Sequence, residues 1–256
     1  MVKNDTSPAK PQDVLIALTL LSRLPLPEDQ AWDRQAKAAW AYPLVGVVLG
    51  GLAALAGLLA MALGLPAPMM ALITLTVLIV LSGGMHEDGL ADTADGFWGG
   101  WTRERRLEIM KDSHIGSYGV IALILSLAAR WACLWLLWDS GAALAVPAVL
   151  ASAVVSRAAM PAVMTALPHA RATGLSHQVG KVSGVTAWLG GGLAALLAVS
   201  LLGGSAIWAM IWGALVVFGL AMLARRKICG QTGDVLGASQ QLAEITLLVC
   251  LSANLA

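Results

Sequence analysis

Charged residues are scarce in this chain of 256 residues: only 12% of the positions are Asp, Glu, Lys or Arg, whereas 58% are hydrophobic. The mean hydropathy is +0.78. A soluble domain of this composition would expose far more apolar surface than globular proteins do. Long, nearly uncharged runs recur along the chain, and they predict an all-α, polytopic integral membrane protein.

The low net charge and the small number of cysteines each argue against a class of function. The formal net charge is only +1, which excludes a strongly basic nucleic-acid-binding protein. The chain has three cysteines, Cys133, Cys229 and Cys250, and no pair of them has the spacing of metal ligands. We interpret them as packing residues rather than as a zinc or redox site.

Runs of about 20 apolar residues, the length that crosses a bilayer as a helix, define the candidate spans. They lie at 43–64, 67–84, 117–138, 143–166, 184–202, 204–224 and 235–256. The apolar stretch 14–21 is short for the core of a signal peptide and lacks a convincing small-residue cleavage site, so we expect an interfacial or re-entrant helix there. The expected architecture is a single domain over 1–256 with about six to seven transmembrane helices plus short interfacial helices.

The basic residues are distributed unevenly. Apart from Arg130 and Arg157, every Lys and Arg lies in the N-terminal arm 1–42 or in a long connection between spans. The long connections are 85–116, 167–183 and 225–234, and they alternate with short turns that carry almost no charge. The positive-inside rule therefore predicts that the arm and the long connections face the cytoplasm.

The segment 86–96, HEDGLADTADG, concentrates acidic residues directly after an apolar run. If it is helical, Asp88, Asp92 and Asp95 occupy positions i, i+4 and i+7 of one face, where neighbouring Cβ atoms lie about 5–6 Å apart. Carboxylates this close repel one another unless a cation lies between them, so we predict a divalent metal site. Hard oxygen ligands favour Mg²⁺ or Mn²⁺, and Mg²⁺ usually completes its shell with waters and substrate phosphates. A solvated acidic loop is the alternative.

The remainder of this connection offers one more candidate. Asp112 either completes the metal shell or caps a helix end. Thr102 is placed to cap a short amphipathic helix that would turn Leu107, Ile109 and Met110 toward the bilayer.

Two arginines lie inside spans. An intramembrane arginine is costly and normally has an anionic partner. For Arg130 and Arg157 the partner is either the Asp cluster with its bound phosphates or an acidic residue of another span, such as Glu244.

Two later segments carry polar groups suited to phosphate contacts or proton transfer. The loop 167–183 contains His169, Arg171, His177 and Lys181, for most of which a solvated basic loop is the default interpretation. The glycines of 230–237 allow close approach of a ligand, and Asp234 either caps the last helix or joins the site.

Together these segments resemble the cobalamin-5′-phosphate synthase family, adenosylcobinamide-GDP ribazoletransferase, over the length of the chain. The most specific match is 86–96. The other matching segments are 22–25 (SRLP), 42–46 (YPLVG), 109–113 (IMKDS), 156–157 (SR), 180–181 (GK) and 231–234 (QTGD).

The resemblance implies an inner-membrane enzyme of the last steps of cobalamin (vitamin B12) biosynthesis that requires Mg²⁺. Such an enzyme joins adenosylcobinamide-GDP to α-ribazole or its 5′-phosphate and releases GMP. The implied catalytic residues are Asp88, Asp92, Asp95 and Asp112, of which the first three hold the metal. The implied substrate-binding residues are His86, Arg157, Lys181, Thr232 and Asp234.

Some questions stay open within this resemblance. The general base is Asp95, Asp112 or His114. The chain also departs from the family pattern, with Gln241 where an acidic residue is common and Cys229 where a glycine is common. Neither departure touches the Asp cluster.

Two other functions were weighed against this resemblance. A CDP-alcohol phosphotransferase would need Ala-Arg soon after Asp-Gly, whereas here Ala91 is followed by Asp92. A divalent-cation transporter is the non-enzymatic alternative, but the carboxylates lie at the end of a span and no inverted repeat is evident. Gly46 and Gly50 form a small-xxx-small pair that favours close helix packing, and the Gly- and Ala-rich spans are compatible with a homo-oligomer.

Overall fold

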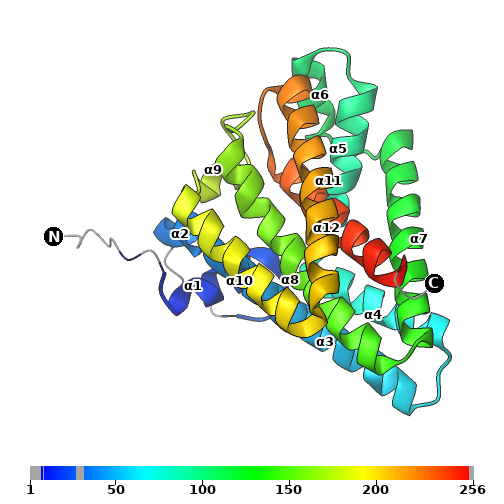
Figure 1. Cartoon of the computed structure of the whole chain (residues 1–256). Helices are drawn as coiled ribbons and strands as arrows, with labels where there is room; N and C mark the ends of the chain where they lie inside the picture. The colour runs from blue at the N-terminus through cyan, green and yellow to red at the C-terminus, as the bar shows by residue number, and fades with distance from the viewer. Residues whose placement is uncertain (1–6, 8, 27–31, 254–256) are drawn as a thin grey trace.

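The computed structural model describes residues 7, 9–26 and 32–253, and it is a bundle of helices (Figure 1). The long and short α-helices are α1 (Gln12–Leu21), α2 (Gln35–Ala38), α3 (Tyr42–Ala62), α4 (Ala67–Ser82), α5 (Met85–Gly99), α6 (Arg103–Ile109), α7 (Ser117–Asp139), α8 (Ala142–Ala166), α9 (Leu175–Val179), α10 (Gly184–Leu202), α11 (Gly204–Ile228) and α12 (Gly233–Ala253). Two 3₁₀ turns, η1 (Trp32–Arg34) and η2 (Ala39–Ala41), flank α2. The expected all-α fold is confirmed.

Within the described residues, 6 helices are long and apolar enough to cross a membrane, and up to 7 if α4 and α5 form one broken span. The 6 are α3 with the short turns before it, α7, α8, α10, α11 and α12. The expected span 67–84 is the one that differs, because α4 has only 16 residues and meets α5 at 85°. The end of the last expected span, 254–256, lies outside the described residues.

The bend between α4 and α5 is caused by two consecutive glycines. Gly83 and Gly84 have φ angles of +69° and +68°, in the left-handed region that glycine adopts without a steric penalty. A Cβ on Gly83 would lie 2.6 Å from Nε of Arg23, and the backbone N–H of Arg23 donates to the carbonyl of Leu81 at 2.8 Å. The segment after α1 therefore packs directly against the bend.

The helix α12 occupies the centre of the bundle and is the most buried of the spanning helices. It packs against α5, α7, α8 and α11 (Figure 1). On the other side of α8, Gly50 allows α3 to approach closely, because a Cβ there would lie 3.0 Å from the Cβ of Ala153. A Cβ on Gly46 would likewise lie 2.6 Å from the Cα of Val154. The predicted close packing at these two glycines is confirmed, and it joins two helices of the same chain, α3 and α8.

The helix α1 has 10 residues, too few to span, and is held by a buried ion pair. Arg34 donates to the carboxylate of Asp13 at 2.9 Å, and the indole Nε1 of Trp40 donates to the same carboxylate at 2.9 Å. The helix expected at 14–21 is therefore present. Residues 1–6, 8 and 27–31 of the arm 1–42 lie outside the described residues.

Candidate active site

The acidic motif forms the helix α5, as its spacing predicts. Its three aspartates differ in their surroundings: Asp88 is exposed, Asp92 is partly buried and Asp95 is 5% exposed. The carboxylates of Asp88 and Asp92 accept no hydrogen bond from any residue that the structure describes. These two side chains are therefore free to bind a ligand.

The helix α12 crosses α5 at a contact between glycines. A Cβ on Gly89 would lie 2.8 Å from the carbonyl oxygen of Asp234, and one on Gly237 would lie 3.2 Å from the Cα of His86. This close approach brings Asp234 beside the motif, where its negative charge acts on Asp92 together with that of Asp88. The motifs HEDGLAD and QTGD, far apart in the sequence, thus meet at one place.

The loop 167–183 packs beside the crossing of α5 and α12. Arg171 donates to Asp234 at 3.2 Å, and its positive charge also acts on Asp92. The Nη1 atom of Arg171 is buried and has no hydrogen-bond partner among the described residues. Because a guanidinium normally uses its donors when it is buried, this atom marks a position for an acceptor such as a phosphate oxygen.

Backbone pairing holds the loop against the start of α12. The N–H of Ala170 donates to the carbonyl of Gln231 at 2.9 Å, and the N–H of Gln231 donates to the carbonyl of Pro168 at 2.8 Å. The side chain of Gln231 accepts from Ser176 at 2.7 Å and lies 3.0 Å from Nδ1 of His169. Partial burial and the neighbouring His177 lower the pKa of His169. The position of Arg171 is therefore fixed by several bonds around it.

Three cations fasten the connection after α5 to the end of α11. Arg103 donates to the carbonyls of Ala170 and Ile228 at 2.5 Å and 3.1 Å, and Arg106 donates to that of Lys227 at 3.0 Å. In return the ammonium of Lys227 donates to the carbonyl of Phe97 at 2.9 Å. The carbonyl groups at a helix C-terminus lack intrahelical partners and attract cations. These contacts therefore satisfy carbonyl groups at the end of α11 and hold the connection after α5 in place.

The short helix α6 differs in part from its prediction. Thr102 caps it as predicted, accepting from the N–H of Arg105 at 3.2 Å. The expectation that Met110 faces the bilayer is wrong, because Met110 is 2% exposed and packs on Gly96 of α5. The absence of a side chain at Gly96 leaves room on the surface of α5, and the side chain of Met110 fills that space.

Asp95, predicted as a metal ligand, turns toward α7. Its two carboxylate oxygens accept the backbone N–H groups of Gly116 at 2.7 Å and Gly119 at 2.9 Å. A carboxylate at a helix N-terminus satisfies unpaired N–H groups and interacts favourably with the helix dipole. In the structure Asp95 joins α5 to α7, and its metal-binding and base roles stay predictions.

Asp112 and His114 lie on an exposed turn. The carboxylate of Asp112 is 2.7 Å from Nδ1 of His114 and accepts its backbone N–H at 3.2 Å. These hydrogen bonds lower the pKa of Asp112, and the carboxylate in turn raises the pKa of His114. The catalytic role predicted for Asp112 is not tested by this geometry.

The predicted substrate-binding residues separate into two groups. Thr232 is buried beside the cluster and donates to Asp234 at 3.1 Å, and Lys181 is exposed just before α10. His86 and Arg157 are each 2% exposed, within the bundle. The Nε2 atom of His86 has no hydrogen-bond partner among the described residues, and His86 lines a cavity of about 40 Å³ together with Ser176. The role of each in binding substrate stays a prediction.

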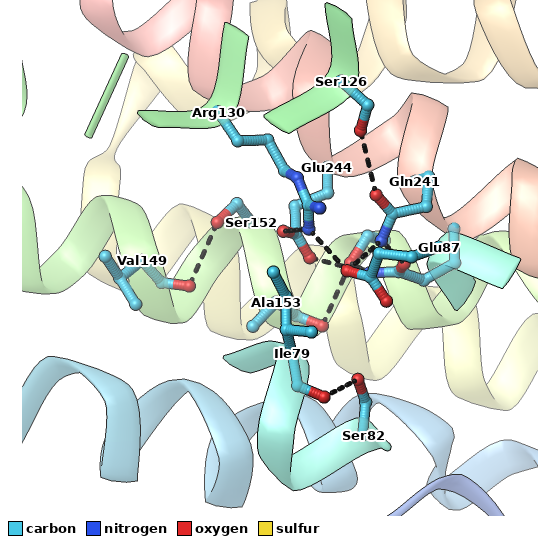
Figure 2. A network of polar contacts seen from close by, with 12 residues as sticks. Ile79, Ser82, Glu87, Ser126, Arg130, Val149, Ser152, Ala153, Gln241 and Glu244 are labelled. Carbon is cyan, nitrogen blue, oxygen red and sulfur yellow. Dashed lines mark hydrogen bonds and ion pairs between the residues drawn. The ribbon is translucent and has the colours of Figure 1, made fainter. Parts of the chain in front are cut away.

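The intramembrane arginines pair inside the protein. Arg130 is 3.0 Å from Glu87 and 3.3 Å from Glu244, the alternative partner that the sequence offered (Figure 2). Arg157 donates to the carbonyl of Ala153 at 2.8 Å and lies in the field of Glu244 and Glu87. The role of Glu87 has no signal in the sequence, because a carboxylate inside an acidic motif suggests a ligand rather than an ion-pair partner.

The donors at the junction of α5 and α12 suit a hard cation that is shared with a ligand. Within residues 9–26 and 32–253, no three His, Cys, Asp or Glu side chains approach closely enough to hold a metal ion by themselves. Asp88 and Asp92 nevertheless present carboxylates that form no ion pair within the described residues, beside Asp234. Mg²⁺ is commonly bound by one or two carboxylates together with waters and substrate phosphates, so these residues fit it.

Fold and site together define a polytopic helical membrane protein that gathers carboxylates and an arginine where a broken helix meets the central one. A family model described as cobalamin-5-phosphate synthase matches residues 13–252. The chain belongs to this family, as its sequence motifs predict.

Curated relatives agree with the family match. Proteins of Brucella ovis, Brucella canis and Brucella melitensis are each 42% identical to this chain over 246 residues, which cover 93% of this chain and 95% of the relative. Each is named adenosylcobinamide-GDP ribazoletransferase. No solved structure matches the chain significantly.

Proposed function

We propose that this protein is an adenosylcobinamide-GDP ribazoletransferase. It transfers the cobinamide-phosphate moiety of adenosylcobinamide-GDP to α-ribazole or α-ribazole 5′-phosphate and releases GMP. The observation that carries the proposal is the family match over residues 13–252, joined to the meeting of two family segments, 86–96 and 231–234, at one carboxylate cluster. The product is adenosylcobalamin or its 5′-phosphate.

The reaction breaks one bond of the diphosphate and forms one phosphodiester bond. A hydroxyl oxygen of the ribazole attacks the phosphorus next to the corrinoid linker, the P–O bond to GMP breaks, and the hydroxyl proton is lost to a base. Negative charge increases on the departing GMP. In such transfers the protein contributes mainly by positioning the reactants and stabilising this charge.

The residues of the junction suit these tasks. Arg171 is oriented by Asp234 and keeps a buried, unpartnered Nη1 that can donate to a phosphate oxygen. The hydroxyl of Thr232 donates to the same carboxylate oxygen of Asp234 as Arg171 does, and so helps to hold that carboxylate. The exposed Lys181, near the same loop, extends the positive charge that a diphosphate requires. These groups bind and orient the diphosphate.

We propose Mg²⁺, with Mn²⁺ as a substitute, as the cofactor. Asp88 and Asp92 would hold it, and Asp234 lies beside them. Asp95 was expected to complete the set, but the hydrogen bonds from Gly116 and Gly119 occupy the carboxylate oxygens that face α7. When bound, the metal neutralises charge on the diphosphate.

The proposed location is the inner membrane, with the site on the cytoplasmic face. Supporting this orientation, the basic residues Arg103, Arg106, Arg171 and Lys227 all lie on the same side of the bundle as the carboxylate cluster, linked by the contacts described above. An accumulation of Lys and Arg at one end of the spans is typical of the cytoplasmic side.

The test is GMP release by the purified protein in nanodiscs, supplied with adenosylcobinamide-GDP and α-ribazole. We expect GMP and a cobalamin product in equal amounts with Mg²⁺, and neither with EDTA. The absence of GMP in nanodiscs that contain folded protein would contradict the proposal. Vesicles that take up divalent cations instead would favour the transporter, and release of CMP from a CDP-alcohol would favour a CDP-alcohol phosphotransferase.

A further inference from the structure

A buried charge network is attached to α5 through Glu87, which points about 100° around the helix from Asp88. Arg130 of α7 is 1% exposed, and its Nη1 bridges Glu87 of α5 and Glu244 of α12 at 3.0 Å and 3.3 Å (Figure 2). Two acids and two arginines, Glu87, Glu244, Arg130 and Arg157, share this region, so the formal charges cancel.

Neutral hydrogen bonds extend the network to further helices. Gln241 of α12 donates to Glu87 at 3.2 Å and accepts from Ser126 of α7 at 3.2 Å (Figure 2). Gln240 donates to Glu244 at 2.7 Å and to Ser156 of α8 at 3.0 Å. The side chain of Glu87 is thus tied to both α7 and α12.

The position of Glu87 in α5 makes this attachment important for the site. Glu87 immediately precedes Asp88, and successive residues of an α-helix point about 100° apart. At the start of α5, fixing the direction of Glu87 therefore helps to set the rotation of the helix and the directions in which Asp88 and Asp92 point, while Asp95 is held to α7 nearer its end. The bend at Gly83–Gly84 gives α5 no continuous helix on its N-terminal side to hold that rotation.

We infer that Glu87 and Arg130 are positioning residues: their buried ion pair sets the rotation of α5, so that Asp88 and Asp92 face Asp234 and Arg171. The inference rests on the proposed function, because it assigns those residues to substrate binding. Neither Glu87 nor Arg130 is assigned a contact with the reacting atoms. Misplacement of reacting groups by about 1 Å is expected to lower kcat by roughly 100-fold.

The experiment compares single and double neutralisations in nanodiscs. Arg130→Gln leaves two carboxylates facing a single arginine, which lowers both thermal stability and kcat. Glu87→Gln/Arg130→Gln removes one charge of each sign, so the unfolding temperature recovers most of its loss. If the pair positions α5, kcat stays roughly 100-fold low in the double variant. If kcat recovers together with the unfolding temperature, the pair has only a structural role and the inference is wrong.

A distance measurement gives a second readout that does not depend on turnover. Spin labels at Trp98→Cys of α5 and Leu175→Cys of α9, in a protein with Cys133, Cys229 and Cys250 replaced, report the placement of α5 by pulsed EPR. We expect a broader or shifted distribution in Glu87→Gln, measured at a temperature where circular dichroism shows that this variant is folded; the variant keeps the Arg130–Glu244 pair. A distribution that matches the parent protein would overturn the inference.

The matched control is Ser126→Ala, which removes a neutral hydrogen bond of the same network and leaves every charge in place. It should keep kcat and the distance distribution close to those of the parent. If no protein releases GMP, including the wild type, the proposed function fails, whereas the EPR comparison still decides whether Glu87 fixes α5.

Discussion

The two sides of α5 carry the same kinds of group in opposite circumstances. On one side Glu87 is 9% exposed and pairs with a cation that also binds Glu244. On the other side Asp88 and Asp92 are more accessible and lie beside a third carboxylate, Asp234, against a single nearby arginine, Arg171. One side has balanced charge, and the other has an excess of negative charge.

This difference distinguishes a network that stabilises the fold from a cluster that can bind a ligand. A charge inside the membrane is tolerated only when it is paired and hydrogen-bonded, so the buried network has to be neutral. Carboxylates that repel one another at an accessible helix junction cost stability, and a bound cation relieves that cost. Helix α5 therefore serves as a link between a structural network and a binding site.

The largest effect on function is expected from Asp92→Asn. Removing this charge weakens the binding of the cation and diphosphate, and kcat for GMP release should fall on the order of 1,000-fold. The unfolding temperature should stay the same or rise, because a repulsion is removed. Glu108→Gln is the matched control, an exposed carboxylate on α6 that should keep full activity. Normal turnover by Asp92→Asn would refute the assignment of this side of α5.

The opposite pattern is expected from Glu244→Gln. The change leaves Glu87 as the one carboxylate for Arg130 and Arg157, and breaking a buried pair costs about 3–5 kcal/mol. Chemical denaturation in mixed micelles measures the loss. The decrease in kcat at a temperature where the protein is folded should be smaller than for Asp92→Asn. A Glu244→Gln protein as stable as the parent would show that the network contributes nothing to folding.

A third variant tests the close contact between α5 and α12. Gly89→Ala would place a methyl group 2.8 Å from the carbonyl of Asp234, and such overpacking costs about 1–3 kcal/mol. It also moves Asp234 away from Asp92, so KM and kcat should both change. Gly99→Ala, on the same helix, would meet only Ile109 at 3.5 Å and should behave like the parent. Equal behaviour of the two variants would contradict the close crossing of α5 and α12.

The smallest effect is a gain in stability outside both regions. Cys229 ends α11 with φ of +59°, which costs a residue with a side chain about 1 kcal/mol relative to glycine. Cys229→Gly should therefore raise the unfolding free energy by about that amount and leave kcat unchanged. Cys229→Ala keeps the strained conformation and should give no gain. Equal stability of the two variants would show that the conformation carries no strain.

The sequence predicted most of the fold because membrane helices depend on length and apolar composition. It also predicted the helix at 86–96, since the i, i+4, i+7 spacing of the aspartates and the flanking glycines are local signals. It also predicted a span that ends at 84, but not that α4 meets α5 at 85° as one bent pair. Two glycines in the left-handed conformation turn the chain at 83–84, whereas glycine is equally common inside continuous membrane helices.

The parts of the site that depend on distant neighbours were less predictable. Asp95 and Asp92 look equivalent in the motif. Only the hydrogen bonds from the backbone N–H groups of Gly116 and Gly119 direct the carboxylate of Asp95 toward α7. Arg171 lies in a loop where basic residues are usually solvated, and its contact with Asp234 spans 63 positions of the chain. Such pairings follow from the crossing of α5 and α12, for which a sequence has no short-range signal.

The most direct test of the contrast between the two sides of α5 is a titration with Mn²⁺ followed by EPR, on the unliganded protein and with GDP present. We expect wild-type protein to bind Mn²⁺ and Asp88→Asn/Asp92→Asn to bind it at least about tenfold more weakly, with Glu108→Gln unchanged. Equal affinity of the wild type and the double aspartate variant would show that the cation is held elsewhere and not by this side of α5.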